Sequence, residues 1–201
     1  MIVVDIETSG LDYSKCGIWQ IAAMEFEAPE NVFFEEAKID EDDIIETKAL
    51  DITGKNEEEL REKNKQSQKE LLNNFLRWIN KIKIKNFICQ NPQFDLAFLI
   101  SKTRKYKFPS GLEFSIPHRA FDLHSIASFK YYQINGKFLI EDNKSKMNLG
   151  NTLKFCGLVD NRKHHNALED VKLTAECFSR IVYGKKLFME FDKYPIPEYL
   201  K

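Results

Sequence analysis

Three short runs of apolar residues near the start of the chain predict β-strands, at residues 2–4, 18–26 and 32–39. Side chains two positions apart in a strand point to the same face. Asp5 and Glu7 are therefore expected to project together, while Val4 and Ile6 face the other way. Because the connections between the runs are short, we expect an antiparallel meander.

A helical repeat follows the strands. Residues 68–82 place apolar side chains at spacings of three and four, which predicts an amphipathic helix. Residues 86–90 predict a short buried strand. Asn91-Pro92 is typical of a helix start, with Asn at the N-cap and Pro at the first helical position. The next helix therefore carries Asp95 in its first turn, beside a strand end.

The last third of the chain predicts a further strand, a hairpin and three helices. Asn135-Gly136 between two apolar runs is the strongest short-range hairpin signal in the sequence. Gly157 and Gly184 are placed to end helices. The predicted elements are a strand at 119–123, a helix at 124–129, hairpin strands at 131–134 and 137–140, a helix at 148–156, and a helix that follows His165 and ends before Gly184.

The order of these elements predicts an α/β fold. The expected sheet is mixed and five-stranded, with the first three strands antiparallel, the later ones parallel, and helices flanking it. We expect one domain at residues 1–183, with a hairpin insertion at about 130–147. Residues 184–201 are expected to form a tail on the surface, without a long extra domain.

Composition places the chain among ordinary globular proteins. It has 201 residues, is 43% hydrophobic, and carries a formal net charge of −1, which argues against a protein that holds nucleic acid by net charge alone. No apolar run approaches the roughly 18 residues of a membrane span, and no signal peptide is visible. A soluble, cytoplasmic protein is expected. Free thiols in a reducing compartment are expected for Cys16, Cys89, Cys156 and Cys177, which lack zinc-type spacing.

Residues 63–107 are locally basic, with eleven bases against two acids. A charge run is usually a solvated surface, and that interpretation is favoured here. The functional alternative is a basic flank that guides a phosphate backbone towards Asp95. Its residues would be Lys102, Arg104, Lys105 and Lys107.

Acidic residues and one histidine form the candidate chemistry. Asp5-x-Glu7 alone is weak, because it should occur by chance roughly 0.7 times in a chain of this length. A hard divalent cation would offset the repulsion between these carboxylates. His165-x₄-Asp170 lies at the start of the last long helix. Together with Asp95, these motifs form an ordered set on suitable elements, whereas His118 and His124 are interpreted as structural or surface residues.

These motifs resemble the DEDDh branch of the proofreading-type 3′-to-5′ exonucleases, the family of RNase T and DnaQ-like enzymes. The matching segments are DIETSG at 5–10, NPQFD at 91–95 and HNALED at 165–170. The histidine branch is indicated because Asn166 stands where the other branch has tyrosine. The resemblance spans about residues 1–183 and implies an RNase H-like fold.

The resemblance implies a phosphodiester hydrolysis assisted by two Mg²⁺ or Mn²⁺ ions. Asp5, Glu7 and Asp170 would hold one ion. The second would lie between Asp5 and the scissile phosphate, with Asp95 contributing through water. His165 would accept a proton from the attacking water, and the product would be a nucleoside 5′-monophosphate.

The same resemblance implies contacts with the terminal nucleotide. The Thr8 backbone and an apolar wedge at Leu11 would touch it, and Asn91 and Phe94 would line the same pocket. For Leu11 and Phe94, plain core packing is an equally favoured alternative. The chain departs from the family at Gln90, Pro92 and Thr53-Gly54, where many members have other residues, and this leaves the substrate class open.

Two classes of function remain to be compared. The first is an active exonuclease on single-stranded DNA or RNA ends, and the second is a catalytically silent module of the same fold that binds nucleic acid or a polymerase partner. The retention of all five proposed catalytic residues favours the enzyme. Proofreading and RNA trimming are both open, with a slight preference for a stand-alone nuclease. A homodimer is also open, and the 131–140 hairpin would supply its surface.

Overall fold

A computed structural model describes residues 1–108 and 115–201, and its centre is a mixed sheet. Within these residues the sheet has five strands in the order β3-β2-β1-β4-β5. The first three strands pair antiparallel, and β4 and β5 continue parallel to β1, as predicted. The bounds are β1 Ile2–Thr8, β2 Ile18–Glu25, β3 Ala28–Glu36, β4 Phe87–Cys89 and β5 Ala120–Asp122.

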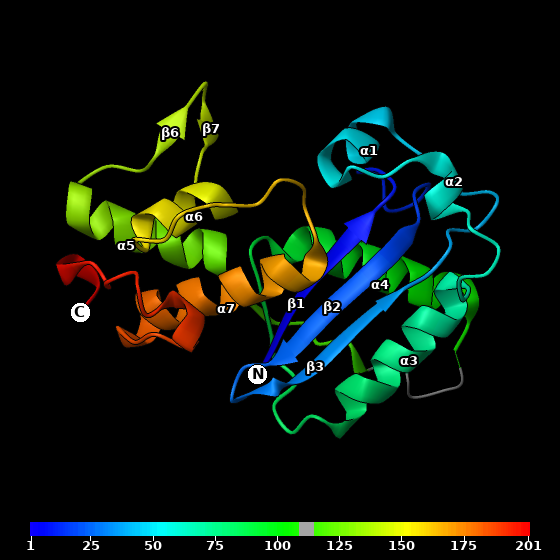
Figure 1. Cartoon of the computed structure of the whole chain (residues 1–201), viewed down its shortest axis with the longest axis horizontal. Helices are drawn as coiled ribbons and strands as arrows, with labels where there is room; N and C mark the ends of the chain where they lie inside the picture. Colours follow the sequence, from blue (N-terminus) through cyan, green and yellow to red (C-terminus); the bar gives the residue numbers. More distant parts are fainter. Residues whose placement is uncertain (109–114) are drawn as a thin grey trace.

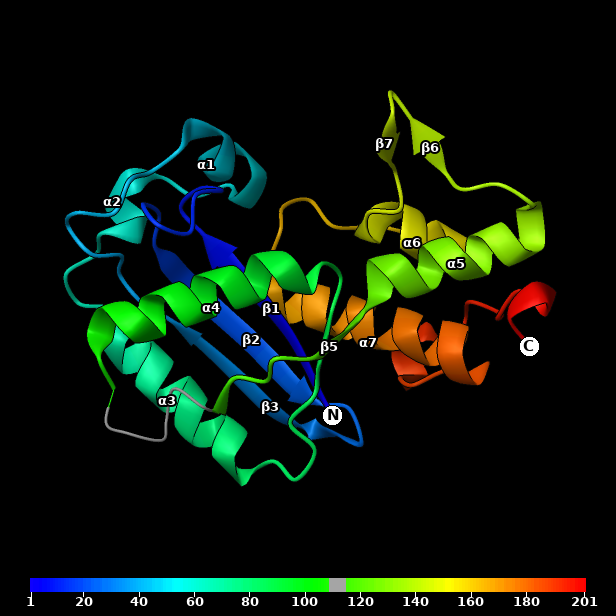
Figure 2. The ribbon, with the colours of Figure 1, turned by 180° about the vertical axis from the view of Figure 1, so that it is seen from behind.

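Helices cover both faces of the sheet, and the pleat of β1 divides its side chains between them. Val4 and Ile6 belong to the core formed with α3 (Gln68–Lys81) and α4 (Pro92–Tyr106). Val3 belongs to the second core, formed with α5 (Leu123–Asn135), α6 (Leu149–Phe155) and α7 (Ala167–Tyr183). Figure 2 shows α4 crossing one face of the sheet. The predicted alternation of β1 is therefore confirmed.

Local sequence explains where the main helices begin. Ser67 and Glu70 form a reciprocal capping box at the start of α3. Pro92 occupies the first turn of α4, as predicted, but the Asn91 side chain makes no capping hydrogen bond among the described residues. At α7, the Asn166 side chain accepts hydrogen bonds from two backbone amides, and Gly184 ends the helix at φ 63°.

The prediction that Asn135-Gly136 turns a hairpin is wrong. Helix α5 continues to Asn135, and Gly136 is its C-cap, with φ 68° and an N–H that donates to the carbonyl of Tyr132. The Asn-Gly pair suits both a hairpin turn and a left-handed helix end. The observed hairpin lies further on, at β6 (Ile140–Glu141) and β7 (Lys144–Ser145), with Asp142 and Asn143 at positive φ in its turn.

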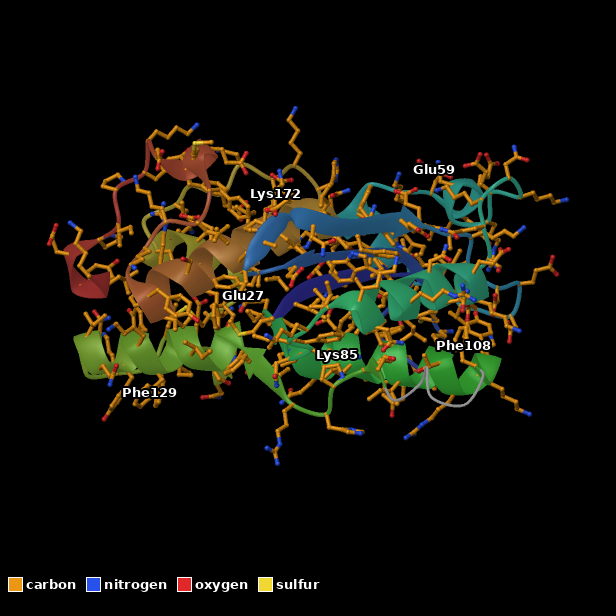
Figure 3. The ribbon with its side chains drawn as sticks, turned by 90° about the horizontal axis from the view of Figure 1, so that it is seen from below. Glu27, Glu59, Lys85, Phe108, Phe129 and Lys172 are labelled. Atoms are coloured by element: carbon orange, nitrogen blue, oxygen red, sulfur yellow. The ribbon has the colours of Figure 1, made fainter. Side chains whose placement is uncertain are left out.

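The outer face of this corrected region exposes aromatic rings. Phe129 is 58% exposed and points away from the ribbon in Figure 3. The rings of Tyr132 and Phe138 stack with centroids 4.8 Å apart. The surface suggested for a homodimer is thus helical, and the homodimer itself stays a prediction.

The C-terminal tail is anchored to α7 by a buried ion pair. Arg180 Nε donates to Glu176 Oε1 over 2.7 Å, and both side chains are fully buried. Arg180 also donates to backbone carbonyls of Phe191 and Tyr194, and Leu200 is 3% exposed. The tail, which includes the short helices η2 (Met189–Phe191) and η3 (Glu198–Leu200), therefore packs on the second core.

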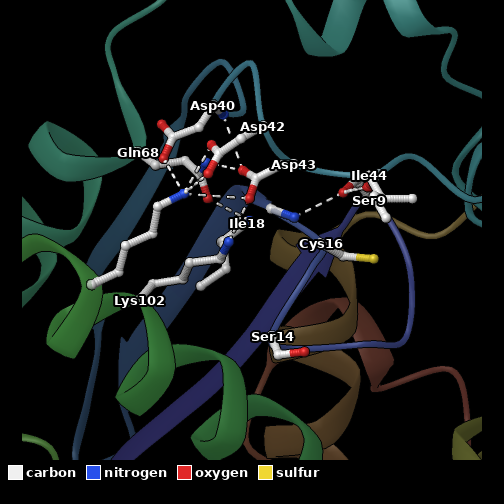
Figure 4. Close-up of polar contacts among 12 residues, drawn as sticks. Ser9, Ser14, Cys16, Ile18, Asp40, Asp42, Asp43, Ile44, Gln68 and Lys102 are labelled. Atoms are coloured by element: carbon white, nitrogen blue, oxygen red, sulfur yellow. Dashed lines mark hydrogen bonds and ion pairs between the residues drawn. The ribbon is translucent and has the colours of Figure 1, made fainter.

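The acid-rich segment after β3 holds α1 (Thr47–Thr53) and α2 (Glu57–Leu60), and a buried network fixes the loop before them. Lys102 Nζ lies 2.6 Å from Asp43 Oδ1, and both side chains are 3% exposed. Gln68 donates to Asp43 and accepts from the amide of Ile18 (Figure 4). This loop is thereby tied to α3 and α4, and it leads directly into α1.

Among the helices of residues 1–108 and 115–201, none is long and apolar enough to cross a membrane.

We expect Lys102→Met to lower the free energy of unfolding by about 3–5 kcal/mol, because it leaves the Asp43 carboxylate buried without its cation. Urea denaturation measures this loss. Arg104→Met changes an exposed residue of the same helix and should cost less than about 0.5 kcal/mol. Equal losses in the two variants would contradict a stabilising role for the buried pair.

Candidate functional site

Four carboxylates from three elements meet at the carboxyl end of β1. Asp5 and Glu7 come from β1 itself, Asp95 from the first turn of α4, and Asp170 from the first turn of α7. Glu7, Asp95 and Asp170 are 7%, 5% and 3% exposed. The structure therefore brings together all four acids that the sequence singled out.

Crowding and burial change the protonation of these acids. Burial raises the pKa of Asp5 well above its usual value, and the charges of Asp95 and Asp170 raise it further. Burial and the charge of Asp170 raise the pKa of Glu7 to about 7. Burial also raises the pKa of Asp95 to about 7, although backbone amides oppose the shift. The cluster favours the uptake of positive charge, as protons or as a cation.

His165 lies at the edge of the cluster. Its Nδ1 is 3.2 Å from Asp170 Oδ2, and its side chain is half exposed. The hydrogen bond to Asp170 raises the pKa of His165 above its usual value. The neighbouring His164 packs its ring against Gly54, where a Cβ would lie 2.9 Å from the ring. Of the two adjacent histidines, the structure places His165 against the acids.

Arg162 is a site residue that the sequence did not single out. Its Nη1 donates to Asp170 Oδ1 over 2.8 Å, and its Nε and Nη2 donate to the two oxygens of Asp160 over 2.9 and 2.7 Å. The side chain is 7% exposed. A loop has no periodicity that would reveal such a contact, and the only signal is an arginine between two acids near the histidine motif.

A cleft of about 410 Å³ opens over the acids. One wall comes from α1, including Lys48 and Ile52, and the other from Asn148 and Leu149 at the start of α6. Figure 1 shows α1 beside the end of β1, and the segment between α6 and α7 on the other side of that strand end. Of the α1 wall, the sequence pointed only to Thr53, at the departure Thr53-Gly54, and it did not point to Asn148 or Leu149 as site residues.

The predicted substrate contacts also lie in this cleft. Leu11 lines the cleft from the loop after β1 and is 69% exposed, so it is not packed in the core. Phe94 lines the cleft but also packs on Phe98, with ring centroids 5.0 Å apart. Asn91 is exposed at the mouth, and the Thr8 hydroxyl is turned away to donate to the Gly10 carbonyl. These four residues therefore line the same cleft, and their contacts with a nucleotide stay a prediction.

The donor set fits a divalent cation. Ligand atoms of Glu7, His165 and Asp170 lie within 4.8 Å of one another. Glu7 Oε1 is buried and has no hydrogen-bond partner among the described residues. Carboxylate oxygens are the ligands that Mg²⁺ and Mn²⁺ prefer. A second acid group, Asp40, Asp42 and Asp43, is instead neutralised by Lys102 and Lys105.

Comparison with known proteins agrees with this geometry. The family model described as Exonuclease, of the RNase T type, matches residues 2–178. The chain is 28% identical over 181 residues to the PolC-type DNA polymerase III of Thermotoga maritima and to that of Thermotoga petrophila. Each match covers 90% of this chain, whereas the chain spans only 12% of the length of these relatives.

Solved structures with a similar fold are nucleases. Escherichia coli exonuclease I with a dA16 oligonucleotide has a TM-score of 0.70 at 18% identity, covering 91% of this chain and 41% of that one. The nuclease domain of 3′hExo, titled a DEDDh family member bound to rAMP, has a TM-score of 0.64 at 12% identity, covering 98% and 95%. The cell-death related nuclease CRN-4 has a TM-score of 0.67 at 14% identity, covering 92% and 64%.

The five-stranded mixed sheet of this chain and its likeness to these structures confirm the predicted RNase H-like fold. Since the family model covers nearly the whole chain, the protein belongs to the RNase T family of exonucleases.

Proposed function

We propose that this chain is a metal-dependent 3′-to-5′ exonuclease that removes nucleoside 5′-monophosphates from single-stranded DNA or RNA. The observation that carries the proposal is the convergence of Asp5, Glu7, Asp95, Asp170 and His165 in one cleft. We take residues 1–183 as the catalytic domain and 184–201 as its tail. A cytoplasmic location remains our expectation.

The acids would hold the cations. Asp5, Glu7 and Asp170 would bind one Mg²⁺ or Mn²⁺, and Asp5 would share a second with the scissile phosphate. Asp95 would complete the site through water. When bound, the two ions would stabilise the attacking and leaving oxygens of an in-line displacement.

His165 would act as the general base. Because its Nδ1 faces Asp170 Oδ2, its Nε2 is the atom free to accept a proton from the attacking water. Asp170 would hold the imidazole in this orientation and stabilise it once protonated. The half-exposed position leaves the ring accessible from the cleft.

The walls of the cleft would select a single-stranded end. Its volume of about 410 Å³ is within the range of about 300–1,000 Å³ typical of small-ligand sites, which suits one terminal nucleotide. Leu11 and Phe94 would contact the base, and Asn91 and the Thr8 backbone the sugar. Exonuclease I was solved with a dA16 oligonucleotide and the nuclease domain of 3′hExo with rAMP, so we retain both DNA and RNA.

The second candidate function is that of a module that binds a polymerase partner. It is favoured by the similarity to PolC-type polymerases, in which the matching region is a small part of a much longer chain. A catalytically silent module in that setting would need no crowded acids. The buried carboxylates are costly to keep together, and this favours an active proofreading or trimming enzyme over a silent one.

Degradation of 5′-labelled single-stranded DNA and RNA tests the proposal. With Mg²⁺ or Mn²⁺ we expect a ladder that shortens from the 3′ end, and with chelator no cleavage. Asp5→Ala should reduce the rate by about 10²-fold or more, because it removes a ligand of both ions. No ladder on either substrate would contradict the proposal, and metal-independent binding of single strands would then favour the silent module.

His165→Ala should lower the single-turnover rate by about 10²- to 10⁴-fold, the usual contribution of a general base. His164→Ala is the matched control, because its ring packs on Gly54 and not on the acids. A comparable loss in both variants, or a loss only in His164→Ala, would contradict the assignment of the base.

In chelator, the thermal unfolding midpoint should fall as the pH rises from about 5 to about 8. The raised pKa values of Asp5, Glu7 and Asp95 mean that the folded protein binds more protons than the unfolded chain from about pH 4.5 to about 7. Stability therefore decreases with pH across this window. The raised pKa of His165 acts in the same direction, because its stabilising charge is lost as the pH rises.

Calorimetry across this pH range checks the expectation. Saturating Mg²⁺ should flatten the pH dependence, because a bound cation stabilises the ionised carboxylates of the folded state. Glu7→Gln should show a shallower slope in chelator than the unchanged protein. Identical slopes for the two proteins would show that the buried acids do not titrate as described.

A further inference from the structure

Arg162 joins the two sides of the segment that carries His165. Its Nε and Nη2 donate hydrogen bonds to the two oxygens of Asp160, and its Nη1 donates to Asp170 Oδ1. Asp160 lies in the loop before α7, and Asp170 lies within α7. The Arg162 guanidinium therefore connects the loop before His165 to helix α7.

The other side of His165 is also fixed. The backbone N–H of His165 donates to the carbonyl of Ile52 in α1 over 3.2 Å, and Asn166 caps α7. His165 is therefore fixed on both sides, by Arg162 before it and by the contact with Ile52 and the Asn166 cap at and after it. Of these, Arg162 is the one that contacts an acid of the cluster. A rigid planar fork suits this task, because it fixes the angle between two carboxylates as well as their distance.

The geometry argues against a direct contact between Arg162 and substrate. Three of its nitrogens already donate to carboxylates, and the side chain is only 7% exposed. Its contact with Asp170 uses Oδ1, whereas His165 Nδ1 faces Oδ2 of the same carboxylate. Each oxygen of Asp170 therefore has its own partner, and the rotation of the carboxylate is restricted.

We propose that Arg162 is a positioning residue that sets the orientation of Asp170 and thereby the place of the His165 imidazole. This inference rests on the proposed function, since it gives His165 the role of the base. A misplacement of about 1 Å in such a group can cost about 10²-fold in rate. The orientation of Asp170 depends on the planar fork of the Arg162 guanidinium and not only on its charge.

Three variants and a control separate these properties. Arg162→Met removes the fork and the charge, and Arg162→Lys keeps the charge without the fork. Asp160→Asn loosens the loop anchor while the contact between Arg162 and Asp170 remains. Lys163→Met changes the exposed neighbour on the same loop.

The first readout is kinetic, with Mg²⁺ and single-stranded substrate. We expect kcat to fall about 10- to 100-fold in both Arg162 variants and by a smaller factor in Asp160→Asn, with KM within about threefold of its starting value. Lys163→Met should leave both constants unchanged. A rise in KM with kcat unchanged would overturn the proposal in favour of substrate binding, and full activity of Arg162→Lys would overturn the requirement for the fork.

The second readout needs neither metal nor turnover. Proton–nitrogen NMR of the histidine rings in chelator, assigned with His165→Ala, should show the His165 Nδ1–H held by Asp170. That signal should shift or broaden in both Arg162 variants and in Asp160→Asn, but not in Lys163→Met. An unshifted signal in all three folded variants would overturn the proposal. A protein without nuclease activity would contradict only the proposed function, because the ring signal reports the positioning independently.

Discussion

Mutual repulsion among four crowded carboxylates, three of them buried and Asp5 half-buried, is the constraint on which the rest of this structure depends. Asp5, Glu7, Asp95 and Asp170 occupy one cleft, and their neighbours and their burial favour the neutral form of the first three. Such a cluster persists only when the strand and the helix starts that carry the acids are held in place by other contacts. The two cores on either face of β1, and the helix starts of α4 and α7, supply that rigidity.

The charge repulsion in two clusters of acids is compensated in different ways. Asp40, Asp42 and Asp43 are neutralised by Lys102 and Lys105, and this pairing holds the loop that leads into α1. Of the four site acids, Asp170 is the one that Arg162 contacts, and Glu7 Oε1 has no partner among the described residues. The first cluster is thus complete in itself, whereas the second retains oxygen donors for a cation. This difference distinguishes a structural network from the proposed metal site.

Sequence predicted those parts of the site that depend on local geometry. The shared direction of Asp5 and Glu7 follows from the strand period, and the position of Asp95 follows from Asn91-Pro92. Arg162 could not be predicted, because its role depends on how a non-repeating loop folds back on α7. The Asn135-Gly136 error has a similar origin, since Tyr131, in the stretch predicted as a strand, packs as part of helix α5 on Phe155 of the second core.

Anomalous scattering from Mn²⁺-soaked crystals tests the central claim most directly, because it locates the cation without reference to activity. We predict a strong peak among the carboxylates of Asp5, Glu7 and Asp170, and none at Asp40, Asp42 and Asp43. A peak confined to the lysine-paired cluster, or no peak near β1 at saturating Mn²⁺, would contradict the assignment of this cleft as a metal-dependent nuclease site.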